Sequence, residues 1–190
     1  MTEAQENTTR LSPDQEVMGR LFVSGDPDDF QELVERFKKP VMKLVYRMTG
    51  DYEGSLEVAQ ETFIKAWRSR KAYDRKRPFT PWLFKIAANA ASDFIAKKRA
   101  KGEEPLESAE GPGEGLQGCH WQDSVIGNIS AQELLSKLDE PYRTALILRF
   151  VEDLTYDDIA RVMETTAAQV KNYLFRGRQK LAGIAKEVLI

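Results

Sequence analysis

The feature that most constrains this chain is an apolar pattern with a period of roughly 3.6 residues, which is the period of an α-helix. The pattern is clearest over residues 30–48, where apolar side chains recur at intervals of three and four positions. No segment alternates apolar and polar side chains over the length of a β-strand. The sequence therefore predicts an all-α fold.

The helical pattern is interrupted between residues 100 and 128. This segment holds six glycines, two prolines and six acidic side chains against one basic, which is typical of a flexible acidic linker. We therefore expect two small helical domains, over residues 1–99 and 129–190. The only cysteine, Cys119, and the only histidine, His120, lie in the linker, so neither a disulfide, a zinc site nor a histidine-based catalytic triad is expected.

In the first domain, capping patterns and apolar spacing predict helices over residues 13–23, 26–49, 53–70 and 80–98. Pro40 is expected to kink or split the second helix, and Thr80 with Pro81 to cap the fourth. The apolar face of the third helix is expected to consist of Leu56, Ala59, Phe63, Ala66 and Trp67.

In the second domain, Asp139 is expected to cap a helix that runs to about residue 150. Two capping boxes follow closely, at residues 155–158 and 166–169, and each opens a helix. Two helices joined by a turn of about three residues, the second of them basic, have the spacing of a helix-turn-helix. Ala160 supplies the small residue in the first helix, and Val170 the apolar anchor in the second.

The exposed face of that second helix is rich in side chains that bind nucleic acids. Asn, Gln and Arg can form bidentate hydrogen bonds with base edges, while Lys and Arg also bind phosphates. We expect this face to bind double-stranded DNA through Gln169, Lys171, Asn172, Phe175, Arg176, Arg178 and Lys180.

A second basic region lies in the first domain, where residues 30–99 carry 16 basic and 8 acidic side chains. Cations interleaved with aromatic rings suit single-stranded DNA, because unstacked bases stack on the rings and the backbone follows the positive charge. Trp82 is assigned to the core. The residues expected to bind the single strand, read its base edges or hold its phosphates are Tyr73, Arg75, Lys76, Arg77, Phe79, Asn89, Ser92, Asp93 and Lys97.

The third helix also carries a stripe of polar side chains. A solvated surface is the default interpretation of such a stripe, and docking of another helical protein is the alternative. The stripe and the aromatic residue opposite it are Glu57, Gln60, Glu61, Lys65 and Phe63.

Several function classes are not expected. The chain has neither a glycine-rich phosphate loop nor a run of about 18 apolar residues, so no nucleotide cofactor and no membrane insertion are expected. A nucleic-acid hydrolase would need clustered carboxylates and a metal, whereas Asp157 and Asp158 are adjacent and do not face each other. With no signal-like N-terminus, we expect a cytoplasmic protein that is not an enzyme and that uses no metal.

Two blocks of motifs resemble the extracytoplasmic-function (ECF) group of sigma-70-type bacterial sigma factors. Residues 30–99 look like region 2, through the segments EVAQETFIKAW (57–67) and FTPWLFKIAAN (79–89). Residues 138–181 look like region 4, through LDEPYR (138–143), LTYDDIA (154–160) and VKNYLFRGRQKL (170–181). The two blocks follow each other in the order of that family.

The resemblance implies a factor that gives core RNA polymerase its promoter specificity, in a stress or envelope response and under an anti-sigma factor. It implies that residues 60–63 bind the β′ clamp helices and that region 4 also sits on the β flap. Tyr73 and Asn89 would meet the single-stranded −10 element. The double-stranded −35 element would be met by Lys171, Asn172, Phe175 and Arg176. The alternative from the residues alone is a stand-alone helix-turn-helix regulator, with residues 30–99 as a dimerisation or sensing domain.

Overall fold

The computed structural model describes residues 13–102 and 131–188, and every regular element in these two ranges is helical, which confirms the all-α prediction. The first range, the N-terminal block, holds α1 (Pro13–Ser24), α2 (Pro27–Thr49), α3 (Tyr52–Ser69), the 3-10 turn η1 (Arg70–Ala72) and α4 (Phe79–Ala100). The second, the C-terminal block, holds α5 (Ala131–Ser136), α6 (Glu140–Phe150), α7 (Tyr156–Val162) and α8 (Ala167–Val188). Within these ranges no helix has the length and apolar character to cross a bilayer.

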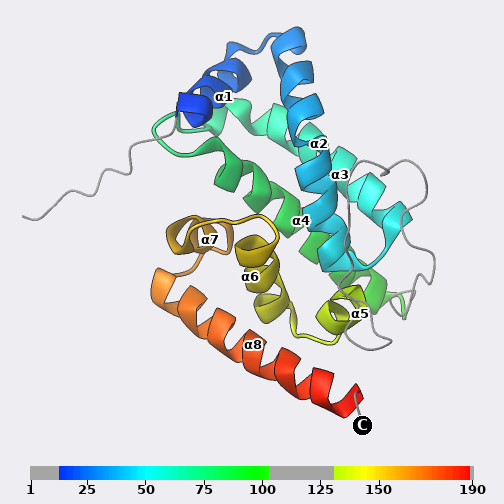
Figure 1. Cartoon of the computed structure of the whole chain (residues 1–190). Helices are drawn as coiled ribbons and strands as arrows, with labels where there is room; N and C mark the ends of the chain where they lie inside the picture. The colour runs from blue at the N-terminus through cyan, green and yellow to red at the C-terminus, as the bar shows by residue number, and fades with distance from the viewer. Residues whose placement is uncertain (1–12, 103–130, 189–190) are drawn as a thin grey trace, which may run out of the picture.

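In the N-terminal block, α2, α3 and α4 each pack against the other two, and α1 packs on α2 and α4 (Figure 1). An aromatic cluster holds α1 in place. The Phe22 ring centroid lies 5.1 Å from that of Phe79 and 5.0 Å from that of Trp82. Because such ring pairs add stability beyond the burial of their area, α1 is fixed over the start of α4.

The ends of the first helices follow the sequence signals. The Asp26 carboxylate accepts a hydrogen bond from the Asp28 N–H at 2.9 Å, and the Asp51 carboxylate accepts one from the Gly54 N–H at 2.9 Å. Gly50 ends α2 with a φ of 72°, a left-handed conformation that glycine adopts without steric cost. The predicted start of α2 at Asp26 and its end at Gly50 are therefore confirmed.

Of the kink or split expected at Pro40, the split does not occur, because Pro40 lies inside the continuous helix α2; the kink stays a prediction. The predicted start of α4 is wrong. The helix α4 begins at Phe79 after Pro78, so Thr80 is already helical and is not the cap.

The predicted buried face of α3 is confirmed for Ala59 and Ala66 and wrong for Leu56. Leu56 is 45% exposed, and the buried side of α3 is formed by smaller residues such as Ser55 and Thr62. Small side chains let α3 approach its neighbours closely: the Ser55 and Thr49 hydroxyls lie 2.8 Å apart in the core. The larger apolar residues of α3 are thereby turned outward.

In the C-terminal block, α7 and α8 form the predicted helix-turn-helix, with α6 packed on both. The Thr155 hydroxyl accepts a hydrogen bond from the Asp158 N–H at 3.2 Å, and the Thr166 hydroxyl accepts one from the Gln169 N–H at 3.1 Å. The turn between the helices contains Glu164 with a φ of 51°, a conformation more common for glycine. The anchor Val170 is fully buried.

The cap predicted at Asp139 is confirmed in its position only. Asp139 does precede α6, but its side chain makes no capping hydrogen bond. Its carboxylate instead accepts a hydrogen bond from Lys180 of α8. The Asp139 side chain therefore pairs with Lys180 of α8 and does not cap the backbone N–H groups of α6.

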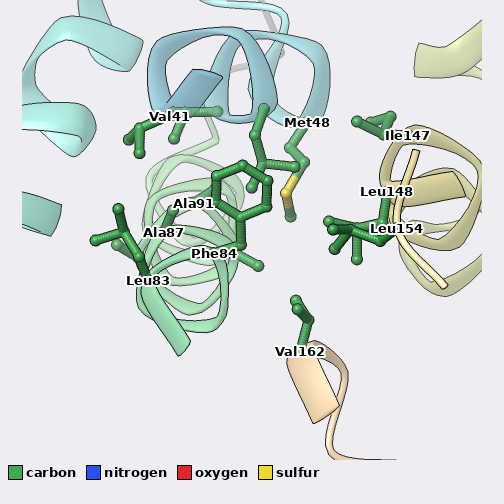
Figure 2. Close-up of a cluster of buried hydrophobic side chains, with 14 of the residues drawn as sticks. Val41, Met48, Leu83, Phe84, Ala87, Ala91, Ile147, Leu148, Leu154 and Val162 are labelled. Carbon is green, nitrogen blue, oxygen red and sulfur yellow. The ribbon is translucent and has the colours of Figure 1, made fainter. Parts of the chain in front are cut away.

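The two blocks pack against each other and share one hydrophobic core. The contacts run from α4 to α7 and from α2 to α5 and α6. Figure 2 shows the central side chains, with Met48 and Phe84 of the N-terminal block opposite Leu148, Leu154 and Val162 of the C-terminal block. The two described ranges therefore form a single packed unit.

Candidate nucleic-acid interface

The outward face of α8 is the first candidate surface. Five of the seven residues predicted to bind duplex DNA are exposed there, and Phe175 has 61% of its surface accessible. Gln169 and Asn172 are half-buried. Exposed aromatic residues of the neighbouring helices flank this face: the Lys171 amine lies 5.8 Å from the Tyr156 ring, and the Arg178 guanidinium 5.5 Å from the Phe150 ring. The arrangement presents cations and amides together on a single helix.

Lys180 differs from the other cations of α8. It forms an ion pair with Asp139, and its amine lies 4.8 Å from the Tyr142 ring. The hydrogen bond from Lys180 lowers the pKa of the Asp139 carboxyl. Lys180 is therefore engaged within the C-terminal block.

The loop before α4 contains the predicted aromatic and basic cluster. Its cations Arg75, Lys76 and Arg77 are exposed, and Arg77 lies 3.5 Å from the Asp74 carboxylate. Tyr73, however, is only 6% exposed, and its hydroxyl donates a hydrogen bond to the Arg77 carbonyl at 2.6 Å. Burial, with a smaller contribution from Asp74, raises the pKa of Tyr73 to about 12.

Phe79 is also buried, with 2% of its surface exposed. The expectation that Tyr73 and Phe79 present free rings is therefore wrong for this conformation. Both rings contact Phe22 of α1, a partner about fifty residues away that no local pattern indicates. Trp82, assigned to the core from the sequence, is half-buried in the same cluster.

Along α4, the structure places Asn89, Asp93 and Lys97 at the surface. Ser92 is half-buried and donates a hydrogen bond to the Glu140 carboxylate of α6. Lys85, which no sequence motif singled out, lies one turn before Asn89 on the same face. The Lys85 amine forms an ion pair at 2.6 Å with Glu164, in the turn of the helix-turn-helix.

A separate apolar groove of about 900 Å³ lies between α2 and α3. The outward-turned residues of α3 line it, and Ile64 is 43% exposed. Of the five residues predicted to bind another protein, Gln60 and Phe63 line the groove. Lys38, Lys39 and Arg68 also contribute to its walls.

The other predicted docking residues lie outside the groove lining. Glu57 is exposed, and Lys65 forms an ion pair with Glu61 at 2.8 Å along α3. The hydrogen bond from Lys65 lowers the pKa of Glu61. The groove itself was missed because its apolar residues were assigned to the core.

Within residues 13–102 and 131–188 there is no group of three or more His, Cys, Asp or Glu side chains that would suit a metal ion. The predictions for Cys119, His120 and the acidic linker lie outside the described residues.

Each of the two helical blocks matches a known protein family. Residues 33–101 match the family Sigma-70 region 2, and residues 129–181 match Sigma-70, region 4. The chain is 31% identical to the ECF RNA polymerase sigma factor SigW of Bacillus subtilis, an alignment that covers 83% of this chain and 89% of SigW. It is also 31% identical to the RNA polymerase sigma-H factor of Pseudomonas aeruginosa, over 88% of this chain and 91% of that protein.

Solved structures share the fold. CnrH in complex with the cytosolic domain of CnrY gives a TM-score of 0.70 at 22% identity, covering 91% of this chain and 97% of CnrH. RpoE in complex with NepR from Bartonella quintana gives a TM-score of 0.63 at 21% identity, covering 83% and 97%. The region 2 and region 4 matches, together with relatives at 31% identity that the chain covers almost end to end, show that it belongs to the ECF group of RNA polymerase sigma factors.

Proposed function

We propose that this ECF sigma factor directs core RNA polymerase to promoters by reading two DNA elements with two different helices. The observation that carries the proposal is the outward face of α8, where exposed cations lie on the second helix of the helix-turn-helix. In such motifs the second helix enters the major groove and contacts base edges near its N-terminus. Asn172 and Arg176 are the proposed readers of the −35 element, with Lys171 on a phosphate.

The −10 element is assigned to α4 and the loop before it. Asn89 and Asp93 are exposed on α4 and can meet base edges, while Arg75, Lys76 and Arg77 provide charge for the backbone. Binding of an extruded base would offset the free-energy cost of unpairing that base. Melting of the promoter duplex therefore needs no catalytic residue. Tyr73 and Phe79 take part in stacking only if the loop opens away from α1.

The groove between α2 and α3 is the proposed site for core polymerase, with the β′ clamp helices as its occupant. Its wall is apolar, and Lys38, Lys39 and Arg68 add positive charge. An amphipathic helix with acidic residues at its margins fits such a groove. Region 4 is proposed to contact the β flap as well, and the chain to act in the cytoplasm, where polymerase works.

Control by an anti-sigma factor in a stress or envelope response is part of the proposal. The support is that two solved structures with this fold are complexes, one with CnrY and one with the anti-sigma factor NepR. A stand-alone regulator is less well supported, because a region 2 match accompanies the helix-turn-helix.

The test is run-off transcription with purified core polymerase over a library of promoters. We expect transcripts that depend on this chain, with Asn89→Ala relaxing the choice of −10 sequence and Arg176→Ala weakening dependence on the −35 sequence. Gln31→Ala in α2 and Arg20→Ala in α1 are matched exposed controls. Absence of transcripts, combined with tight binding to duplex DNA without polymerase, would favour the stand-alone regulator.

A further inference from the structure

Two cations on the outward face of α8 are each flanked by an aromatic ring from another helix. The Lys171 amine lies 5.8 Å from the centre of the Tyr156 ring, at the start of α7. The Arg178 guanidinium lies 5.5 Å from the centre of the Phe150 ring, at the end of α6. Both distances are within the roughly 6 Å over which the face of a ring attracts a cation.

The Phe150 ring is not explained by the core. It has 61% of its surface exposed, and hydrophobic stabilisation scales with the area removed from water, so an aromatic ring adds little to folding at this position. Within the described part of the chain, no carboxylate forms an ion pair with Arg178. The contact between the ring and Arg178 is therefore what distinguishes Phe150 from other exposed side chains of α6.

The backbone that carries Phe150 is anchored on both sides. The Val151 N–H donates a hydrogen bond to the Ile147 carbonyl at 2.9 Å, and the Leu154 N–H donates one to the Leu148 carbonyl at 3.0 Å. Both acceptor residues, Ile147 and Leu148, are fully buried. The ring therefore projects from a turn that is fixed to the core, and it can restrain the long side chain of an arginine.

A ring and a carboxylate have different consequences for a cation. The Asp139 carboxylate neutralises Lys180 and accepts one of its N–H donors. A ring attracts the cation through its face, so the N–H groups at the edge of a planar guanidinium stay available to a phosphate. Contact with the ring also restricts the side chain in advance, which lowers the entropy cost of ordering it on binding. Phe150 can therefore orient Arg178 without withholding it from DNA.

The spacing of the two ring-held cations suits the major groove. Lys171 and Arg178 are seven residues apart, which places them on one face of α8 and about 10 Å apart along its axis. The major groove of B-DNA is about 12 Å wide. The helix α8 lies along one edge of the structure, where a duplex can approach it (Figure 1). With Lys171 on a phosphate at one side of the groove, Arg178 can reach the backbone at the other side.

We propose that Phe150 is a positioning residue for promoter binding: it holds Arg178 in the orientation that receives a phosphate at the border of the major groove. This inference rests on the proposed role of α8 at the −35 element. Base reading stays with residues between the two held cations, such as Asn172 and Arg176. The geometry of the recognition helix is thereby set in part by α6, which lies outside the helix-turn-helix.

The first test detects the contact without DNA or polymerase. The side-chain Nε–Hε signal of Arg178 is recorded by NMR in the isotope-labelled full chain and assigned by its loss in Arg178→Ala. Because an aromatic ring displaces the resonances of nearby protons, we expect Phe150→Leu to move this signal toward its position in the unfolded chain. Phe150→Trp keeps a ring that attracts cations more strongly and should keep the signal displaced. A signal that is unchanged in Phe150→Leu would overturn the proposal.

The second test measures binding of a labelled duplex, taken from a promoter that the run-off library selects, to the full chain on core polymerase. We expect Phe150→Leu to raise the Kd by roughly twofold to fivefold and Phe150→Trp to restore it. The salt slope should stay near the wild-type value in Phe150→Leu, which keeps the charge, and should fall by about 1 in Arg178→Ala. Val17→Ala in α1 changes another exposed apolar side chain and should leave both quantities unchanged.

A double-mutant cycle separates positioning from direct contact with DNA. In an Arg178→Ala background, Phe150→Leu should have no further effect, because the ring acts through the guanidinium. A loss that persists in this background would mean that the ring meets DNA itself, and it would overturn the positioning role. A wild-type Kd in Phe150→Leu would also overturn it and would leave the ring to a protein partner. If the wild-type chain yields no transcript, the sigma-factor function has failed, whereas the NMR test still decides the contact.

Discussion

The carboxylate of Glu152 lies 4.0 Å from the amine of Lys43, across the boundary between the C-terminal and N-terminal blocks. The Glu152 side chain is 8% exposed, and its burial raises its pKa to about 7, against an opposing effect of Lys43. A carboxyl group that prefers its neutral form here would regain an ordinary pKa near 4.5 once the blocks separate.

Opening of the two blocks should therefore depend on pH. The closed state binds more protons than the open state between pH 4.5 and about 7, so it is favoured at the acidic end of this window and weakened as the pH rises through it. Fluorescence energy transfer between dyes on α1 and α8 of the full chain would report the change. We expect the transfer efficiency to decrease from about pH 5 to about pH 8.

Glu152→Gln is the control for this titration. The amide keeps the size of the side chain and cannot ionise, so its closed state should persist at the alkaline end of the window. A variant that loses energy transfer over the same pH range as the wild type would assign the titration to another group.

Substitution of Gly54 would test how closely α3 packs on α4. A Cβ at this position would lie 2.1 Å from Cζ of the Phe94 ring, so the ring has to move. We expect Gly54→Ala to lower the free energy of unfolding by about 1–3 kcal/mol, measured by urea denaturation. At Gly183 in α8, no atom of the described part of the chain lies within 4 Å of such a Cβ, so Gly183→Ala should be neutral or stabilising. A stable Gly54→Ala protein would show that Phe94 relocates freely.

Short sequence patterns predicted correctly the helix ends that depend only on neighbouring residues. The caps at Asp26, Thr155 and Thr166 and the end of α2 at Gly50 each depend on residues within four positions. These signals also placed the helix-turn-helix, because its two caps are only eleven residues apart.

Features that depend on distant contacts were not predictable in this way. The helix α3 has apolar residues on more than one face, and periodicity does not show whether Leu56 faces the protein's own core or a groove for a partner. Burial of Tyr73 depends on Phe22, and engagement of Ser92 depends on Glu140, 48 residues further along the chain. The candidate DNA residues were therefore identified by type, whereas their accessibility required the structure.

Substitutions of Tyr73 would test how strongly its side chain restrains the loop before α4. Tyr73→Phe removes the 2.6 Å hydrogen bond to the Arg77 carbonyl and keeps the ring among Phe22 and Phe79. We expect a loss of about 1 kcal/mol in unfolding free energy and faster amide exchange at residues 74–77. Tyr73→Ala removes the ring as well and should cost about 3–5 kcal/mol. Identical exchange in Tyr73→Phe and wild type would mean that the hydroxyl does not restrain the loop.

Lys171 and Lys180 form a matched pair on α8. Both are exposed lysines, and among the described residues only Lys180 has a carboxylate partner, Asp139. With core polymerase present, we expect Lys171→Ala to weaken binding to −35 duplex DNA and to reduce the salt slope of the binding constant by about 1. Lys180→Ala should change both quantities less, because Asp139 already neutralises that amine. Asp139→Asn releases Lys180 and should steepen the salt slope. Equal effects of the two alanine substitutions would show that DNA displaces Asp139 from Lys180, and that the ion pair does not withhold this side chain from the promoter.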